Sequence, residues 1–302
     1  MPAIIGVIFL IIFYLIFGSV DKVTNNYNNS SFNLIVPHHN IPVRNFNLPQ
    51  PKIAADSAVA FDENSGYRIF NQNANELRPI ASLTKLMTAL VFLDTKPDWQ
   101  KKIKIIKSDL QIGGKANLFV DDELTVDDLW AVSLVASDNT AITALVRSTG
   151  LSQAEFVKKM NMKVHDLNIP NLKFSEPTGL DIKNEGSAVA VAKLVNFALT
   201  KNKIKDILKQ AHYTFKVSDN ITRNINSTDQ LLDEPLPNNI IMIGGKTGHL
   251  NEAGYCFAGV FEINGHKIIT AVLGAPINDN RFSETVKILN WTKKVYLWDN
   301  IK

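Results

Sequence analysis

Cysteine is almost absent from this chain of 302 residues, and Cys256 is the only one. A single cysteine cannot form a disulfide within the chain, and no group of Cys and His residues has zinc-ligand spacing. The adjacent pair His38 and His39 has no acidic or Cys partner nearby, which favours a solvated linker over a metal site. We therefore expect no disulfide, no metal ion and no other cofactor, and a small buried side chain at Cys256.

The chain also has no large excess of positive or of negative charge. Lys and Arg number 32 against 29 Asp and Glu, and no long basic run occurs. This balance gives no electrostatic signature for binding nucleic acid, so we expect no such partner. Hydrophobic residues make up 45% and charged residues 20%, which is enough apolar material for a sizeable core.

Residues 1–20 contain no charged side chain and are almost uniformly apolar. Such a segment is long enough to cross a bilayer, which takes about twenty residues. A cleaved signal peptide is the alternative, but no Lys or Arg precedes the apolar run and no clear cleavage site follows it. We therefore predict an uncleaved membrane anchor, although Lys22 after the segment leaves its orientation undetermined by charge.

Residues 21–53 are rich in Asn and Pro and show no sustained periodicity, which predicts a flexible linker. One domain, residues 54–302, follows. It opens with a predicted β-hairpin, continues with helical patterns over about 105–215, and returns after residue 240 to short apolar strands, one hairpin turning at Asn264-Gly265. A helix over about 281–296 ends the chain. This order predicts one sheet built from both ends, with an inserted helical region.

Ser82 and Lys85 have the spacing of a nucleophile and its base at the start of a helix. Positions i and i+3 share a helix face, and a buried lysine can lose its proton and accept one from the serine hydroxyl. Apolar residues then recur at helical spacing from Leu83, which predicts a helix packed on the core. The pattern is weak alone, because Ser19 and Lys22 match it at the membrane edge.

Two further motifs strengthen the assignment. Ser137-Asp138-Asn139 lies between two apolar helical patterns, whereas the second Ser-Asp-Asn, at 218–220, lies in a polar region typical of a surface turn. Lys246-Thr247-Gly248 occurs once, at the end of an apolar strand. Each motif has an ordinary structural explanation, but the three in this order are hard to obtain by chance.

These residues resemble the three motifs of penicillin-binding proteins and class A β-lactamases. The stretches ASLTKLMTAL, FSEPTGLD and GGKTGHLNEAGYC are similar to the family of D-alanyl-D-alanine carboxypeptidases and endopeptidases, which are low-molecular-mass penicillin-binding proteins. The similarity covers about residues 54–298. It implies an α+β fold of the β-lactamase and transpeptidase type, in which helices flank a five-stranded antiparallel sheet.

The resemblance also implies roles for the motif residues. Ser82 would attack the carbonyl after a D-alanine of a peptidoglycan stem peptide, and Lys85 would take its proton. Ser137 would relay that proton, and Asn139 would bind the substrate and orient Lys85.

On the third motif, Lys246 and Thr247 would bind the substrate carboxylate, and Gly248 would let the peptide lie along the strand. The N–H groups of Ser82 and His249 would form the oxyanion hole, with the His249 side chain at the rim. β-Lactams would be covalent inhibitors.

Other readings remain open at this point. A class A β-lactamase needs a carboxylate to activate water, and Glu176 is a candidate, but Leu180 stands where those enzymes have Asn. We therefore read Glu176-Pro177-Thr178-Gly179 as a structural turn. A non-catalytic wall-binding protein is a further alternative, which the complete motif set disfavours.

Finer assignments follow from smaller features. Asn251-Glu252-Ala253-Gly254 favours the endopeptidase branch slightly over the carboxypeptidases. Arg281 could assist carboxylate binding, but we predict a charged cap at the start of the last helix. The expected location is the outer face of the cytoplasmic membrane, in the periplasm or cell-wall space.

Overall fold

The computed structural model describes residues 41–44, 47–111, 117–218, 221–233 and 235–298. The predicted anchor, most of the predicted linker, the second Ser-x-x-Lys pair, the two adjacent histidines and residues 219–220 of the second Ser-Asp-Asn lie outside these residues. Within the described ranges, no helix combines the length and the apolar character that crossing a membrane requires.

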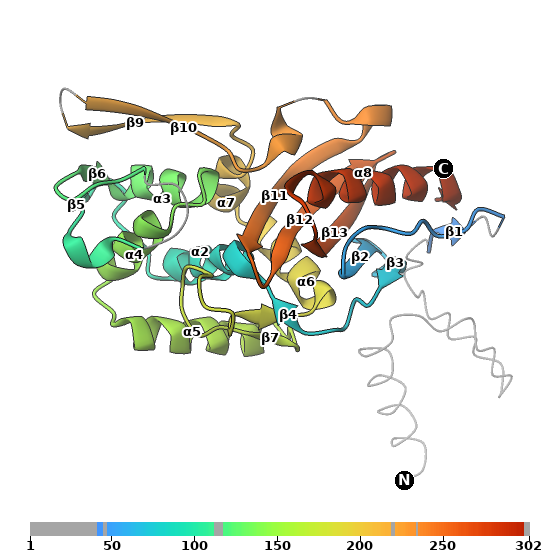
Figure 1. Cartoon of the computed structure of the whole chain (residues 1–302), viewed down its shortest axis with the longest axis horizontal. Helices are drawn as coiled ribbons and strands as arrows, with labels where there is room; N and C mark the ends of the chain where they lie inside the picture. Colours follow the sequence, from blue (N-terminus) through green and yellow to red (C-terminus); the bar gives the residue numbers. More distant parts are fainter. Residues whose placement is uncertain (1–40, 45–46, 112–116, 219–220, 234, 299–302) are drawn as a thin grey trace, which may run out of the picture. The chain divides into compact units, whose positions relative to one another are not determined.

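A five-stranded antiparallel sheet forms the centre of the domain, in the order β11-β12-β13-β2-β3 (Figure 1). Its strands are β2 (Ser57–Asp62), β3 (Arg68–Gln72), β11 (Ile241–Leu250), β12 (Gly254–Ile263) and β13 (His266–Ala275). The first two come from the beginning of the domain and the other three from its end, as the sequence predicts. Strand β11, which carries the third motif, lies at the edge of the sheet.

The hairpin turns follow the predicted chemistry. Asn264 and Gly265 join β12 to β13 with φ angles of 51° and 83°, and two positive φ values are what a type I′ turn requires. β2 and β3 form the first hairpin around the predicted turn. Cys256 lies on β12 and is fully buried, so this prediction is confirmed.

Helices cover both faces of the sheet. On one face α6 (Ala188–Leu199) contacts β2, β12 and β13, and on the other α8 (Asn278–Val295) contacts β3, β12 and β13. Each face has its own apolar cluster. Ser187 caps α6 by accepting a hydrogen bond from the Ala190 N–H at 3.1 Å, as predicted. Helix α8 begins three residues before the predicted start, because residues 278–280 form its first turn.

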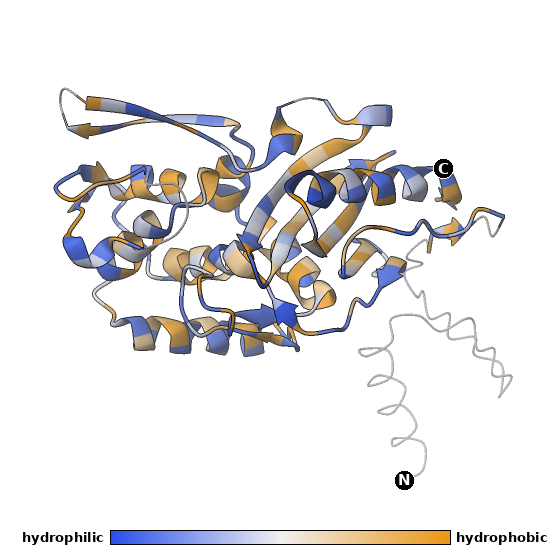
Figure 2. Cartoon of the chain, in the orientation of Figure 1, coloured by the Kyte–Doolittle hydropathy of each residue, from blue (hydrophilic) through white to orange (hydrophobic). Residues whose placement is uncertain are grey.

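The remaining α-helices are α2 (Thr84–Asp94), which precedes the inserted region, and four within it: α3 (Val126–Val135), α4 (Asn139–Ser148), α5 (Gln153–Asp166) and α7 (Asn202–Ile207). Helix α2 packs against α4, α5 and α6, and every residue from Thr84 to Phe92 is buried. The prediction that this helix packs on the core is therefore confirmed, and its polar residues Thr84, Lys85 and Thr88 are buried as well. Figure 2 shows this helix mainly in the colours of the hydrophobic end of the scale.

Short strands complete the fold. They are β1 (Val43–Arg44), β4 (Arg78–Pro79), β5 (Lys102–Lys104), β6 (Glu123–Thr125), β7 (Leu172–Lys173), β8 (Glu185–Gly186), β9 (His212–Ser218), β10 (Ile221–Asn226) and β14 (Tyr296–Leu297). β9 and β10 pair as a hairpin, β4, β7 and β8 form a three-stranded sheet, and β5 pairs with β6.

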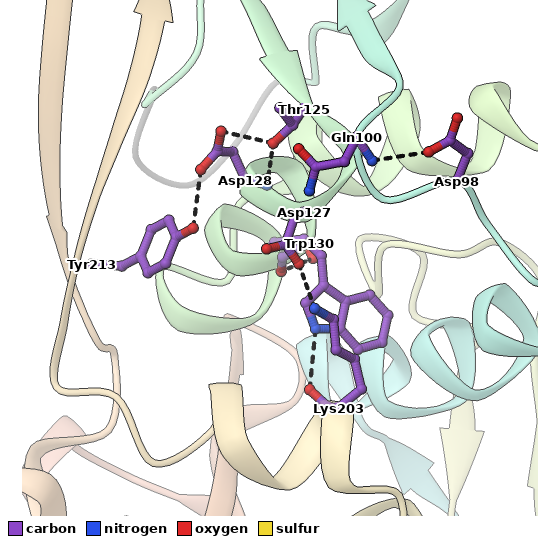
Figure 3. Close-up of polar contacts among 9 residues, drawn as sticks. Asp98, Gln100, Thr125, Asp127, Asp128, Trp130, Lys203 and Tyr213 are labelled. Atoms are coloured by element: carbon purple, nitrogen blue, oxygen red, sulfur yellow. Dashed lines mark hydrogen bonds and ion pairs between the residues drawn. The ribbon is translucent and has the colours of Figure 1, made fainter.

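Polar contacts attach the β9–β10 hairpin and α7 to the start of α3 (Figure 3). The Tyr213 hydroxyl donates to Asp128 at 2.9 Å, and Asp128 in turn accepts from Thr125, whose hydroxyl caps the helix. Lys203 on α7 donates to Asp127 at 2.5 Å, and its backbone carbonyl accepts from the Trp130 indole N–H. These bonds fix the base of the hairpin, from which the chain runs on toward the third motif.

The C-terminal end of the predicted linker needs correction. Val43 pairs with Leu297 in the β1–β14 ladder, Ile53 is buried in the cluster beneath α8, and the Gln50 side chain donates to the Asn71 carbonyl. These residues contact the domain, which therefore begins about ten residues before the predicted boundary at residue 54. Isolated apolar residues such as these carry no periodicity from which the sequence could reveal their partners.

Candidate active site

Ser82 lies in a single 3-10 turn, Ala81–Leu83, that leads directly into α2. The sequence places it in the first turn of the α-helix itself, so the structure shifts it one turn earlier. Ala81 has a φ angle of 47°, in the left-handed region that costs a residue with a side chain about 1 to 2 kcal/mol. Such backbone strain beside a reactive group is common at functional sites.

Lys85 is fully buried, and its ammonium group lies at the centre of the site. It donates to Ser82 Oγ at 2.7 Å, to Asn139 Oδ1 at 2.6 Å and to the Thr178 carbonyl at 2.6 Å. Burial lowers its pKa to about 7, against the smaller opposing effects of Glu176 and Asp138. These three bonds use all the hydrogens of the charged ammonium. With this pKa the group is substantially neutral near pH 7, and the lone pair of the neutral amine can then accept the proton of the serine hydroxyl.

The loop between α3 and α4 supplies the second motif. Ser137 has a φ angle of 58°, and Asp138 caps α4 by accepting from the Ala141 N–H at 2.8 Å. The cap fixes the first residue of the helix, Asn139, against Lys85. The positive φ directs the Ser137 hydroxyl toward strand β11. Ser137 and Asp138 thus lie between two helices, where the sequence predicts this triplet.

Strand β11 brings the third motif to the same place. Lys246 is fully buried and donates to Ser137 Oγ at 2.8 Å and to the Thr247 carbonyl at 3.2 Å. Burial, followed by the charges of Lys85 and Arg281, lowers its pKa well below that of an ordinary lysine. The hydroxyls of Thr247 and Thr228 are hydrogen-bonded at 2.5 Å. The three predicted motifs thus form one connected network.

Gly248 allows β11 to approach the serine turn. A Cβ atom at this position would lie 2.9 Å from the Ile80 carbonyl oxygen and 3.2 Å from the Ser82 nitrogen. Any side chain would therefore push the strand away from Ser82. The next residue, His249, is exposed and stacks on Tyr255 with ring centroids 4.0 Å apart, at the rim where the sequence predicts it.

The Glu176 carboxylate makes its hydrogen bonds within its own turn and to Asn184. It accepts from the Thr178 N–H and hydroxyl, both at 2.6 Å, and from the Gly179 N–H and the Asn184 amide, both at 2.5 Å. The turn is joined to α2 through Lys85 and through Thr88, which donates to the Pro177 carbonyl at 2.6 Å. These contacts support the reading of residues 176–179 as a structural turn.

Replacing Gly179 by alanine is expected to disturb the serine turn. Gly179 has a φ angle of 90°, and an added Cβ would lie 2.1 Å from the Ala81 carbonyl oxygen. We expect about 1 to 2 kcal/mol of loss from the left-handed backbone and about 1 to 3 kcal/mol from overpacking. Urea unfolding and the rate of Ser82 acylation measure the two consequences.

Gly150→Ala is the matched control, since Gly150 has a similar φ of 77° and open space around it. It should lose only the backbone contribution and acylate at the normal rate. Equal losses of stability in the two variants, with normal acylation in both, would show that Gly179 does not support the nucleophile.

The prediction that Arg281 is a charged cap at the start of the last helix is wrong. This residue is 7% exposed and not a solvated cap, although it lies in the first turns of α8. Its guanidinium donates to the Gly248 carbonyl at 3.2 Å and lies over the Tyr255 ring. A second cation therefore lies behind the third motif. An arginine at a helix start gives no sequence signal of such a contact, which depends on how α8 crosses the sheet.

Comparison with known proteins agrees with this geometry. The family model described as D-alanyl-D-alanine carboxypeptidase matches residues 44–277. This chain belongs to the D-alanyl-D-alanine carboxypeptidase family. Within it the chain is 29% identical to a D-alanyl-D-alanine endopeptidase of Pseudomonas aeruginosa over 80% of this chain and 78% of that protein. It is 32% identical to one of Haemophilus influenzae over 73% of this chain and 74% of that protein.

A solved structure has the same fold as this chain. The crystal structure of the Streptomyces K15 DD-transpeptidase superposes with a TM-score of 0.73 at 26% identity, covering 81% of this chain and 98% of that one. The predicted fold class is confirmed, and so is the predicted family. The chain is a serine-type hydrolase of the D,D-peptidase class.

Proposed function

We propose that this enzyme cleaves peptidoglycan stem peptides through an acyl-enzyme on Ser82. The observation that carries the proposal is the 2.7 Å bond between the Ser82 hydroxyl and a buried Lys85 whose pKa is about 7. Ser82 Oγ attacks the carbonyl carbon of a D-alanine while Lys85 takes the hydroxyl proton. The backbone N–H groups of Ser82 and His249 hold the negative oxygen that forms.

The leaving group departs with a proton delivered through Ser137. Its hydroxyl accepts from Lys246 and lies in the loop that also holds Asn139 against Lys85. In this proposal the Ser137 hydroxyl gives its proton to the departing amine and takes the proton that Lys85 received from Ser82. The C–N bond of the peptide breaks as the amine is protonated, and an ester on Ser82 remains. Water then cleaves the ester and returns the proton to Ser82.

Strand β11 recognises the substrate in this proposal. It is the edge strand of the sheet, so a peptide can add to it through backbone hydrogen bonds, and Gly248 leaves room beside Ser82. Lys246, Thr247 and the adjacent Arg281 supply donors for a C-terminal carboxylate.

We propose that the enzyme cleaves peptide cross-links in preference to removing a terminal D-alanine. The support is the 251–254 sequence and the two relatives named endopeptidase, which this chain matches over 78% and 74% of their length. Digesting purified sacculi and separating the products tests it. Loss of cross-linked dimers supports the proposal, and loss of terminal D-alanine with intact dimers contradicts it. The Ser82→Ala variant is the control.

Anchoring at the outer face of the cytoplasmic membrane through residues 1–20 is a further part of this proposal. Its support is the length and apolarity of the segment and the location of the substrate. Fractionating cells that express the full chain should recover it in carbonate-washed membranes with its N-terminus intact. A soluble, shortened chain would favour the cleaved signal peptide.

The β-lactamase alternative makes a different prediction for Glu176. Because its carboxylate is occupied by the turn, Glu176→Gln should lower the free energy of unfolding by about 1 to 3 kcal/mol, the cost of an unpaired buried polar group. We expect the wild type to hydrolyse nitrocefin slowly and the variant to do so at the same rate. Thermal unfolding and nitrocefin hydrolysis measure these effects. Rapid hydrolysis that the variant abolishes would instead assign Glu176 to water activation.

A further inference from the structure

Asp229 is a buried carboxylate beside the third motif, in the segment that connects β10 to β11. It is 3% exposed, and its Oδ1 accepts from the Leu231 N–H at 3.1 Å. Within the described part of the chain, its Oδ2 is buried without a hydrogen-bond partner. Burying a carboxylate oxygen without a hydrogen-bond partner costs free energy, so we expect nearby charges to offset that cost.

The segment is fastened between the second and third motifs. The Thr228 N–H donates to the carbonyl of Val135, two residues before Ser137, and the Thr228 hydroxyl bonds Thr247. Asp229 is therefore held in place by contacts on both sides of the substrate site.

The charges around Asp229 are mainly positive. Lys246 on β11 and Arg281 on α8 both interact with it electrostatically, as does exposed Asp233 on its own loop, and Lys85 on α2 interacts with Lys246 in the same way. Lys85 and Arg281 lower the pKa of Lys246, and Asp229 raises it. Burial raises the pKa of Asp229 itself to about 7, against the smaller effects of the two cations.

The protonation of Lys246 decides how many donors it offers. Its Nζ already donates to Ser137 and to the Thr247 carbonyl, which uses both hydrogens of a neutral amine. Only the charged ammonium has a third N–H. A substrate carboxylate therefore finds a free donor on Lys246 only if this lysine stays protonated although it is fully buried.

We propose that Asp229 is a positioning residue for carboxylate recognition, a buried counter-charge that keeps Lys246 protonated without occupying its third N–H. This inference rests on the proposed function. It explains why the carboxylate lies near both cations while its Oδ2 makes no hydrogen bond: a direct ion pair would use the donor that the substrate needs. Asp229 acts through Lys246 and does not touch the reacting atoms.

Asp229→Asn tests this role, because asparagine retains the oxygen that accepts from Leu231. The kcat/KM of a peptide ending in D-Ala-D-Ala is measured against pH. The fall of kcat/KM at alkaline pH reports loss of the Lys246 proton. In Asp229→Asn this limb should move about one pH unit lower, since a nearby opposite charge shifts a pKa by about one to three units. At pH values above the lowered limb of the variant, its KM for the peptide should be about tenfold higher than that of the wild type, with little change in kcat. The limb near pH 7, which Lys85 sets, should stay in place.

Two controls separate this role from a structural one. Asp233→Asn removes an exposed acid from the same loop and should leave the profile unchanged, because solvent screens it. The methyl ester of the same peptide has no carboxylate, and its hydrolysis should have the same pH profile in the wild type and in Asp229→Asn. A shift of equal size with the ester would overturn the inference.

A measurement on the wild type guards against a variant that does not fold. Carbon-13 NMR of the Asp229 carboxyl, assigned through its own backbone, should show a higher titration midpoint after reaction with penicillin G, whose carboxylate adds a second anion. An unchanged midpoint, or coincident peptide profiles in an active wild type and Asp229→Asn, would contradict the inference alone. A wild type that cleaves neither a D-Ala-D-Ala peptide nor a cross-linked dimer would instead contradict the proposed function.

Discussion

Changing Ser82 to alanine is expected to reduce the cleavage of D-Ala-D-Ala peptides by about 10⁶-fold, the order of loss when a serine hydrolase loses its nucleophile. The hydroxyl of Ser82 is the only one bonded to Lys85 in the described structure, so no other group can form the ester. The fold should persist, because the turn is held by backbone bonds and by Gly179 and Gly248 packed against it.

Steady-state kinetics and thermal unfolding of Ser82→Ala measure these two effects. Because the variant retains Lys246 and Thr247, it should still bind the peptide, which isothermal titration calorimetry can show. Residual cleavage within a hundredfold of the wild type would mean that another group attacks the peptide bond, and the assignment of Ser82 would be wrong.

Changing Lys85 to methionine is expected to slow the acylation of Ser82 by about 10³ to 10⁴-fold, toward the upper range for loss of a general base. Methionine has a similar length and keeps the buried volume, but it cannot accept the serine proton. The loss also leaves the Asn139 side-chain oxygen and the Thr178 carbonyl without their donor. Stopped-flow measurement with penicillin or an ester substrate gives the rate constant.

The pH dependence of the acylation rate tests the role of Lys85 as the base. Lys85 acts as a base only when neutral, and its pKa is lowered to about 7. Wild-type acylation should therefore rise with pH through about 7 and level off above it, whereas Lys85→Met should show no limb there. Lys193→Met, which removes an exposed lysine from α6, should behave like the wild type. A limb that persists in Lys85→Met would assign the base to another residue.

Local sequence signals account for much of the fold and for the identity of the site. The Asn264-Gly265 turn, the Ser187 cap and the three motifs each combine a residue type with a short-range geometric requirement, and the structure has them where the sequence predicts them. Assembling one sheet from both ends of the domain follows from the order of strands and helices.

Features that depend on long-range packing could not be predicted in this way. The enclosure of α2, the contact of Arg281 with Gly248 and the pairing of Val43 with Leu297 all join segments far apart in the sequence. Asp229 is the clearest case, since an aspartate between polar residues is typical of a surface loop. Only the structure shows that it is buried near two cations.

The most direct test of Ser82 as the acylated nucleophile is mass spectrometry of the intact protein and of its peptides after treatment with penicillin G. As Ser82 Oγ bonds to the lactam carbonyl, the lactam C–N bond breaks and its nitrogen takes up the serine proton. The protein should gain the mass of one whole penicillin, located on the peptide that contains Ser82 and retained for minutes. A folded protein without this adduct, or with it on another residue, would contradict the account.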